Sequence, residues 1–359
     1  MTDTSTPQLL IRGLDSLYVS YYLDTATSEV DWDELAYRKE RARTERGELA
    51  ELQLGSEKFA LMPYGKKPYT YMLVSRAFEV RLAERLQPSC HVQFYSEALW
   101  IDGLDKLEGR FRDWCRSLRL VHVKPDIVAR ADWAFDYHIA EIDFDTDSFV
   151  SYSAKDATYR EHRKAQTFSF GRGDVVVRVY DKVAEIEQQS NKAWFFDLWG
   201  RKDQVLRVEF QVRGERLREA GIATLSDLRQ LQHDLLRELA SNHTSLRAKA
   251  RDANRSRWPL HPLWKRLLSD IASMPQTGLV RSVDPESALR WRRQQQLRAL
   301  YGSLKGLAAI HGLIGGSNEP VPFQTLLRAL PRLLEREHSE TLWREDVQQR
   351  MTAHRFGKW

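Results

Sequence analysis

Three segments of this 359-residue chain alternate charged and apolar side chains with a period of two. They run from about Ile127 to Ile142, from Val175 to Lys182 and from Val205 to Val212. Successive side chains of a strand point to opposite faces of a sheet, so this period predicts three strands, each with one apolar and one charged face. The apolar faces can bury against helices, while the charged faces stay open to water.

If the three strands are neighbours, one surface collects carboxylates, cations and a tyrosine. Its members are Arg130, Asp132 and Asp136 on the first strand, Arg178, Tyr180 and Lys182 on the second, and Arg207 and Glu209 on the third. Carboxylates in such a cluster can hold a hard divalent cation, cations can offset charge on a phosphate, and a tyrosine hydroxyl can attack phosphorus. A sheet with one wet face shows the same alternation, so the pattern alone leaves a structural interpretation open.

The order and spacing of these residues resemble the replication initiation factor (Rep_trans) family. This family comprises rolling-circle replication initiators of plasmids and some filamentous phages, with related relaxases of integrative elements. The resemblance covers about residues 128–216 and includes a Gly171-Arg172-Gly173 turn and a glutamate soon after the lysine, at Glu185 or Glu187. Its three motifs are Arg130-Ala131-Asp132-Trp133-Ala134-Phe135-Asp136, Arg178-Val179-Tyr180-Asp181-Lys182 and Arg207-Val208-Glu209.

The resemblance implies a nuclease that nicks one DNA strand and keeps the 5′ phosphate on a tyrosine, a role that falls on Tyr180. It also implies a divalent metal, Mg²⁺ or Mn²⁺, for which Asp132 and Glu209 are the expected ligands, with Asp136 as a third. From their shared face, Arg178, Lys182 and Arg207 are expected to contact phosphate.

The motifs that the chain lacks narrow the chemistry. There is no His-x-His pair, which favours carboxylate metal ligands, and no His-x-x-Arg box, which weighs against a tyrosine recombinase. Without a Gly-x-x-x-x-Gly-Lys loop, unwinding requires a separate host helicase as partner. A homodimer would suit a cycle that one tyrosine starts and a second one ends. Tyrosines that do not share a strand face with two flanking cations are weaker nucleophile candidates, namely Tyr18, Tyr21, Tyr22 and Tyr159.

The chain is expected to be α+β, with an antiparallel-rich mixed region over residues 1–222 and a mostly helical domain over residues 223–359. From His233 to Trp359 there are 21 Lys and Arg against 12 Asp and Glu, a net charge of +9, so the rest of the chain carries −4. This basic region, with tryptophans beside its cations at Arg257-Trp258 and Arg290-Trp291-Arg292, is predicted to bind DNA. A solvated helical surface without that role explains the same charges.

The chain is expected to work in the cytoplasm without membrane contact. No stretch approaches the roughly 20 apolar residues that a membrane helix needs, and the N-terminus is polar. Cys90 and Cys115 have no metal or redox spacing and are read as reduced thiols. Three functions remain open: a replication initiator, a relaxase for mobilisation or conjugative transfer with the same chemistry, and a non-catalytic DNA-binding protein with a nuclease-like fold.

Overall fold

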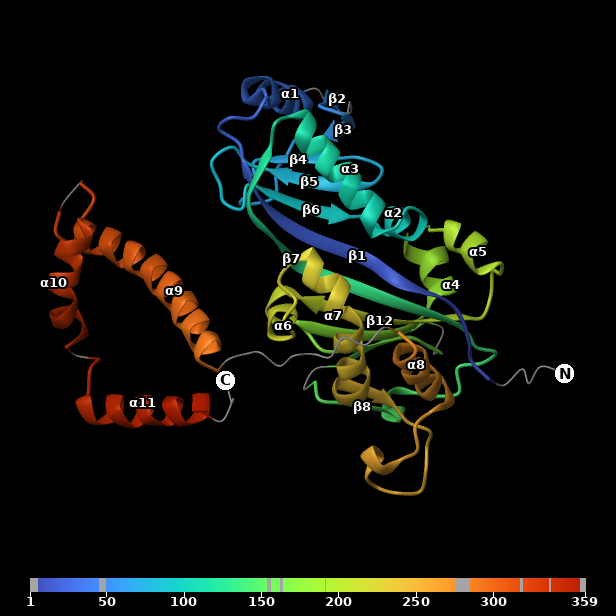
Figure 1. Ribbon diagram of the computed structural model, residues 1–359. Helices are drawn as coiled ribbons and strands as arrows, with labels where there is room; N and C mark the ends of the chain where they lie inside the picture. Colours follow the sequence, from blue (N-terminus) through green and yellow to red (C-terminus); the bar gives the residue numbers. More distant parts are fainter. Residues whose placement is uncertain are drawn as a thin grey trace. The chain divides into compact units, whose positions relative to one another are not determined.

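The computed structural model describes residues 6–44, 50–153, 156–161, 164–190, 192–274, 285–316, 319–335 and 337–355. Its contacts divide the chain into two units, Met1–Ser282 and Val283–Trp359. The first unit is α+β, as expected, and is built on one large antiparallel sheet (Figure 1). The second unit is helical.

The sheet has eleven strands, and every neighbouring pair in it is antiparallel. Its two long central strands, β1 and β7, pair along most of their length with several register shifts, which are typical of β-bulges. From edge to edge the order is β2 (Ala50–Leu54), β3 (Glu57–Leu61), β4 (Tyr71–Val74), β5 (Phe78–Leu82), β6 (Cys90–Phe94), β1 (Gln8–Asp24), β7 (Val121–His138), β12 (Val205–Arg213), β11 (Val175–Asp181), β10 (Lys164–Phe170) and β9 (Asp156–Glu161).

One face of the sheet carries the main hydrophobic core. Helices α3 (Leu104–Ser117) and α7 (Leu225–Glu238) lie along this face (Figure 1). α3 buries Phe111 and Trp114 at helical spacing, and Phe111 packs against Tyr21, Phe78 and Phe94 of the sheet. The remaining helices and the small second sheet of this unit are α1 (Trp32–Thr44), α6 (Gly214–Glu219), α8 (Pro262–Ala272), β8 (Phe149–Ser151) and β13 (Thr244–Leu246).

The other face of the sheet is polar, and short helices cover it at one end. These are α2 (Ser96–Ile101), α4 (Lys182–Glu185) and α5 (Trp194–Trp199). Ile186, Phe195, Trp199 and Val205 form a second, smaller core beneath them. Trp199 of α5 donates a hydrogen bond to Asp136 of β7, so this cover reaches over some of the charged residues singled out above.

Three expectations from the sequence differ from the observed fold. The many charges of residues 155–164 favour a loop or short helix, but this segment contains edge strand β9. The charged stretch Asp31–Leu52 is typical of a single helix, but α1 ends at Thr44 and Leu52 belongs to β2. The domain boundary expected after residue 222 lies after Ser282 instead. α7 and α8 bury Leu228, Leu235, Trp264 and Leu267 in the core of the sheet, so they belong to the first unit.

The second unit contains α9 (Pro285–Ile314), α10 (Phe323–Leu334) and α11 (Glu340–Arg355). Tyr301 of α9 and Phe323 of α10 meet edge to face, with ring centroids 5.8 Å apart. Within the part of the chain that the structure describes, no helix combines the length and apolarity needed to cross a membrane.

Candidate active site

The three motif strands are neighbours in the sheet, in the order β7–β12–β11, as the interpretation of the sequence required. Tyr180 lies opposite Arg207, and Arg178 lies opposite Glu209. On the other side of β12, Gln211 lies opposite Asp132. Residues directly opposite each other in a sheet share a face. The motif side chains of these strands therefore meet on the polar face, as predicted.

Tyr180 and Glu209 form the centre of the site. The Tyr180 hydroxyl donates a hydrogen bond of 2.8 Å to Glu209 Oε2, and Arg178 Nη1 donates one of 2.7 Å to Glu209 Oε1. Burial, together with the adjacent negative charge of Glu209, raises the pKa of Tyr180 well above its ordinary value. The Tyr180 phenol is therefore protonated at neutral pH. Its proton points to the carboxylate of Glu209, which Arg178 orients.

Asp132 lies on the same face, beside this pair. Arg130 Nε donates to its Oδ1 at 2.8 Å, and Arg130 Nη2 donates to its Oδ2 at 2.5 Å. Burial raises the pKa of Asp132 to about 6, and the negative charge of Glu209 adds to this effect although Arg130 opposes it. Asp132 and Glu209 therefore lie close enough to repel each other, an arrangement that a cation between them would relieve.

Lys182 occupies a different element from the one expected. β11 ends at Asp181, whose side chain caps the next helix by accepting a hydrogen bond of 3.0 Å from the Ala184 amide, so Lys182 is the first residue of α4. Its ammonium pairs with Glu185 and lies 5.7 Å from the centre of the Tyr180 ring. Burial and the nearby charge of Arg207 lower the pKa of Lys182.

Arg207 and Asp136 are not placed for the roles expected of them. Arg207 is completely buried, and its Nε and Nη2 donate to the two Asp136 oxygens at 2.6 and 2.7 Å. Its Nη1 donates to Asp15 at 2.9 Å, and Trp199 Nε1 donates to Asp136 at 2.9 Å. Arg207 therefore has no free edge for a phosphate. Asp136 is completely buried and does not line the pocket described below, so a metal ion in that pocket does not reach it. The pair joins β12 to β7 beneath the site.

A pocket of about 510 Å³ opens above this pair. Among the residues singled out from the sequence, it is lined by Arg130, Asp132, Tyr180, Lys182 and Glu209. Arg207, Asp136 and Arg178 are not part of its lining. The helices at the end of the polar face add polar and aromatic walls, with Tyr95, Ser96, Glu97, Glu185, Lys192 and Trp194.

Asp15 is a pocket residue that the sequence analysis did not single out. It accepts hydrogen bonds from Ser96 Oγ at 2.9 Å and Trp100 Nε1 at 2.8 Å, besides the one from Arg207. Burial opposes its ionisation, but the charge of Arg207 holds the pKa of Asp15 well below its ordinary value. A carboxylate in the middle of β1, a strand rich in apolar and aromatic residues, was the available signal.

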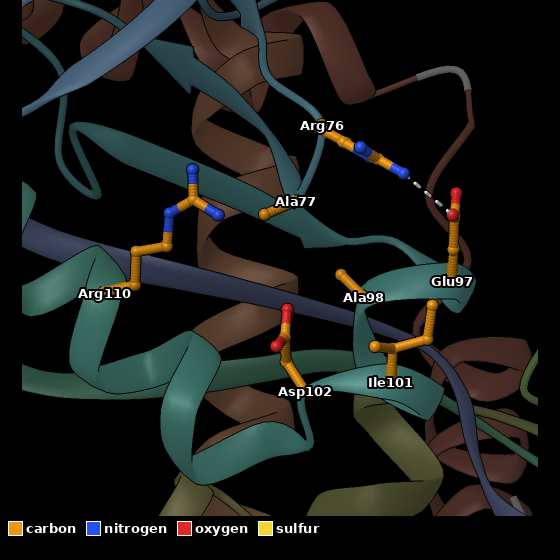
Figure 2. A pocket seen from close by; sticks show the side chains of 7 residues that line it. All are labelled: Arg76, Ala77, Glu97, Ala98, Ile101, Asp102 and Arg110. Carbon is orange, nitrogen blue, oxygen red and sulfur yellow. Dashed lines mark hydrogen bonds and ion pairs between the residues drawn. The ribbon is translucent and has the colours of Figure 1, made fainter.

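A smaller pocket of about 230 Å³ adjoins the first and shares Arg76 and Glu97 with it (Figure 2). Figure 2 shows Arg76 reaching towards Glu97, and the closest approach of their side chains is 3.5 Å. The other arginine of this pocket, Arg110, is held by two hydrogen bonds to Glu57. None of the residues predicted to act on DNA lines this pocket.

The basic run near residue 250 belongs to the first unit, and acidic partners hold many of its cations. Lys249 pairs with Asp145, Arg255 with Asp147, and Arg266 with Asp270. The Trp258 indole donates to the Asp252 carbonyl at 2.6 Å. The side chains of Arg290, Trp291 and Arg292 lie outside the described residues, so DNA binding by this basic region stays a prediction.

Comparisons with known proteins give one distant structural neighbour. No family model matches the chain, and no curated protein matches it. A solved structure of a rolling circle replication initiator protein from Geobacillus stearothermophilus aligns with a TM-score of 0.45 and 19% sequence identity. The alignment covers 72% of this chain and 96% of that one.

Proposed function

We propose that this protein is a site-specific nuclease that nicks one strand of DNA and so starts rolling-circle replication. The nicked strand becomes covalently bonded to Tyr180. The main support is the 2.8 Å hydrogen bond from the Tyr180 hydroxyl to Glu209, in a pocket that also presents Arg130 and Lys182. A nucleophile held by a base, which a third group orients, is the general arrangement for covalent catalysis. Arg178 is that third group.

In the proposed reaction, Tyr180 Oη attacks the phosphorus of one phosphodiester and its proton passes to Glu209. The bond from phosphorus to O3′ breaks, and O3′ keeps the electron pair and takes a proton from water. The products are a free 3′ hydroxyl and a 5′ phosphate esterified to Tyr180. In the reverse direction a 3′ hydroxyl gives its proton to the hydroxide left by the first step and attacks the phosphotyrosine. The bond from phosphorus to Tyr180 Oη breaks, and the phenolate recovers its proton from Glu209. Strand rejoining therefore needs no external energy source.

The cations of the pocket suit the charge that develops on phosphorus. Arg130 is part of the lining and is about one quarter exposed at its side chain, whereas Lys182 is almost fully buried beside the tyrosine ring. Preorganised positive groups in a partly dehydrated site stabilise such charge more strongly than they would in water. Arg130 is thus the better placed of the two to contact a phosphate oxygen that enters from solvent.

A divalent metal, Mg²⁺ or Mn²⁺, fits the carboxylates in part. Asp132 and Glu209 line the same pocket and raise each other's energy when ionised, so they are the residues that would hold the ion. Among the described residues, no three acidic, histidine or cysteine side chains converge on one point. Mg²⁺ is commonly held by one or two carboxylates plus phosphate and water, so two suffice. When bound, the ion would polarise the phosphodiester.

The proposal is tested with a supercoiled plasmid that carries the DNA flanking this chain's own gene, incubated with protein and Mg²⁺ or Mn²⁺. The wild-type protein should convert the plasmid to open circles, and Tyr180→Phe should not, while both bind the plasmid equally. Because phenylalanine keeps the ring and removes only the hydroxyl, undiminished nicking by Tyr180→Phe would refute the assignment. A plasmid without the flanking DNA controls for nonspecific cleavage.

A further inference from the structure

The polar face of the sheet continues past the pocket and carries a row of aromatic side chains. We call Tyr18, Tyr22, Tyr69 and His91 the aromatic row. Tyr18 and Tyr22 lie on β1, His91 lies on β6 opposite Ser20, and Tyr69 lies in the segment that connects β3 to β4. None of the four has a part in the proposed chemistry.

Three rings of the aromatic row, those of Tyr18, His91 and Tyr69, neighbour one another, and all four members are only partly buried. The ring centroids of Tyr18 and His91 are 6.1 Å apart. The rings of Tyr69 and His91 are stacked, with centroids 6.0 Å apart and an angle of 27° between their planes. A hydrogen bond of 2.8 Å between His91 Nδ1 and Ser20 Oγ fixes the imidazole. Burial and the charges of Arg81 and Lys66 lower the pKa of His91 to about 4, so its ring is neutral at pH 7.

Cations flank this row. The Arg130 guanidinium lies 5.0 Å from the centre of the Tyr18 ring, and the Lys124 ammonium lies 5.2 Å from that of Tyr22. The acidic Glu79 on the same face is buried and paired with Arg81 at 2.5 Å. An exposed lysine and a partly exposed arginine beside half-buried rings match a chain of flat bases joined by negative phosphates.

The aromatic row is continuous with the pocket. Tyr18 lies opposite Arg130 on β7 and opposite Gln93 on β6, and both of these partners line the pocket that contains Tyr180. Arg130 therefore touches both surfaces. A polymer that enters the pocket at Tyr180 and follows the sheet would pass over Tyr18 next.

We propose that the aromatic row binds the unpaired DNA strand next to the nick site, by stacking bases on Tyr18, Tyr22 and Tyr69 and by phosphate contacts with Lys124. This proposal rests on the proposed function, because it takes the pocket as the place of cleavage. Stacking on aromatic rings inside a positive groove is the general physical basis of binding to single strands without sequence preference. Bases in an intact duplex cannot offer their faces, so the aromatic row should distinguish single strands from duplexes.

The test measures binding without cleavage, by fluorescence anisotropy of a short labelled oligothymidylate and of a labelled duplex with the full-length protein. Tyr18→Ala should weaken single-strand binding roughly ten-fold, and Tyr18→Phe, which keeps the ring, should bind like the wild type. Duplex binding should not change in either. The matched control is Tyr37→Ala, because Tyr37 is a 59% exposed tyrosine on α1 that is not part of the aromatic row.

The phosphate contact proposed for Lys124 is tested independently in the same binding experiment. Lys124→Ala should reduce the slope of log affinity against log salt by about 1 for the oligothymidylate. If Tyr18→Ala does not fold, as judged by urea unfolding, Tyr22→Ala and Tyr69→Ala carry the same expectation. The proposal is overturned if the alanine variants bind the oligothymidylate as tightly as Tyr37→Ala, or if they lose duplex binding to the same extent.

Failure of this proposal is distinguishable from failure of the nuclease assignment. If Tyr180→Phe still nicks while Tyr18→Ala loses single-strand binding, the nucleophile is wrong and the aromatic row stands. If Tyr180→Phe is inactive while Tyr18→Ala binds normally, the nucleophile stands and the aromatic row has no role in binding.

Discussion

The side chains of Arg207 and Asp136 form a completely buried, doubly hydrogen-bonded ion pair between β12 and β7, with N–O distances of 2.6 and 2.7 Å. Removing one partner of such a pair leaves an uncompensated charge in the interior, which typically costs about 3 to 5 kcal/mol. The pair therefore supports the floor of the pocket rather than the chemistry above it.

Arg207→Met should accordingly lower the free energy of unfolding by about 3 to 5 kcal/mol, measured by urea denaturation. The matched control is Arg38→Met, which breaks an exposed pair with Glu34 and should cost less than about 1 kcal/mol. A full loss of nicking by Arg207→Met with unchanged stability would mean that Arg207 does act on the DNA.

Glu209→Gln should slow nicking by about 10² to 10⁴-fold without unfolding the protein, because glutamine keeps the shape of the side chain but cannot take the Tyr180 proton as readily. Initial rates at saturating DNA measure this loss. Glu187→Gln is the control, since it makes the same change at an exposed glutamate near the site. Equal rates for the two variants would remove Glu209 from the role of base.

Asp132→Asn should raise the concentration of Mg²⁺ needed for half-maximal nicking by ten-fold or more, since one of the two carboxylates proposed to hold the ion becomes neutral. Nicking rates over a Mg²⁺ titration measure it, and chelation of the metal should abolish nicking by the wild-type protein. The same half-saturating concentration in wild type and Asp132→Asn would argue against a metal at this carboxylate.

Acid should destabilise the fold through His91. Its pKa of about 4 in the folded chain lies below the ordinary 6.5, so the unfolded chain binds more protons between these values. Stability is therefore fully present above pH 6.5 and falls as the pH drops towards 4, by at most roughly 3 kcal/mol. Urea unfolding at several pH values should show a weaker dependence in His91→Gln, which cannot titrate. An identical pH dependence in both proteins would contradict this origin.

Strand alternation was sufficient to predict which motif side chains share a face. It placed Tyr180, Asp132 and Glu209 on one surface because parity along a strand is fixed by the backbone. The alternation along a strand does not show, however, how deeply a side chain is buried. Arg207 and Asp136 share that face too, but Asp15 of β1 and Trp199 of α5 cover them. Asp15 is 192 residues from Arg207 and Trp199 is 63 residues from Asp136, so the alternation within one strand does not show these contacts.

Local chemistry outweighed the pattern in two further places. The cap that Asp181 forms ends β11 one residue early and places Lys182 on a helix. β9 was not predicted as a strand because its residues are mostly charged or polar. It is an edge strand, and edge strands commonly carry charges that discourage pairing with a strand of another molecule. The aromatic row escaped notice in the sequence because β1, β6 and the segment before β4 meet only in the folded sheet.

Covalent attachment to Tyr180 is tested most directly by identifying the residue that carries the DNA after nicking. Protein is allowed to nick the flanking-DNA plasmid, the reaction is denatured, the DNA is digested, and the peptides are analysed by mass spectrometry. We predict a nucleotide phosphate on the peptide that contains Tyr180. The absence of any adduct under conditions where nicking occurs, or an adduct on Tyr18, Tyr22 or Tyr159 instead, would contradict the account.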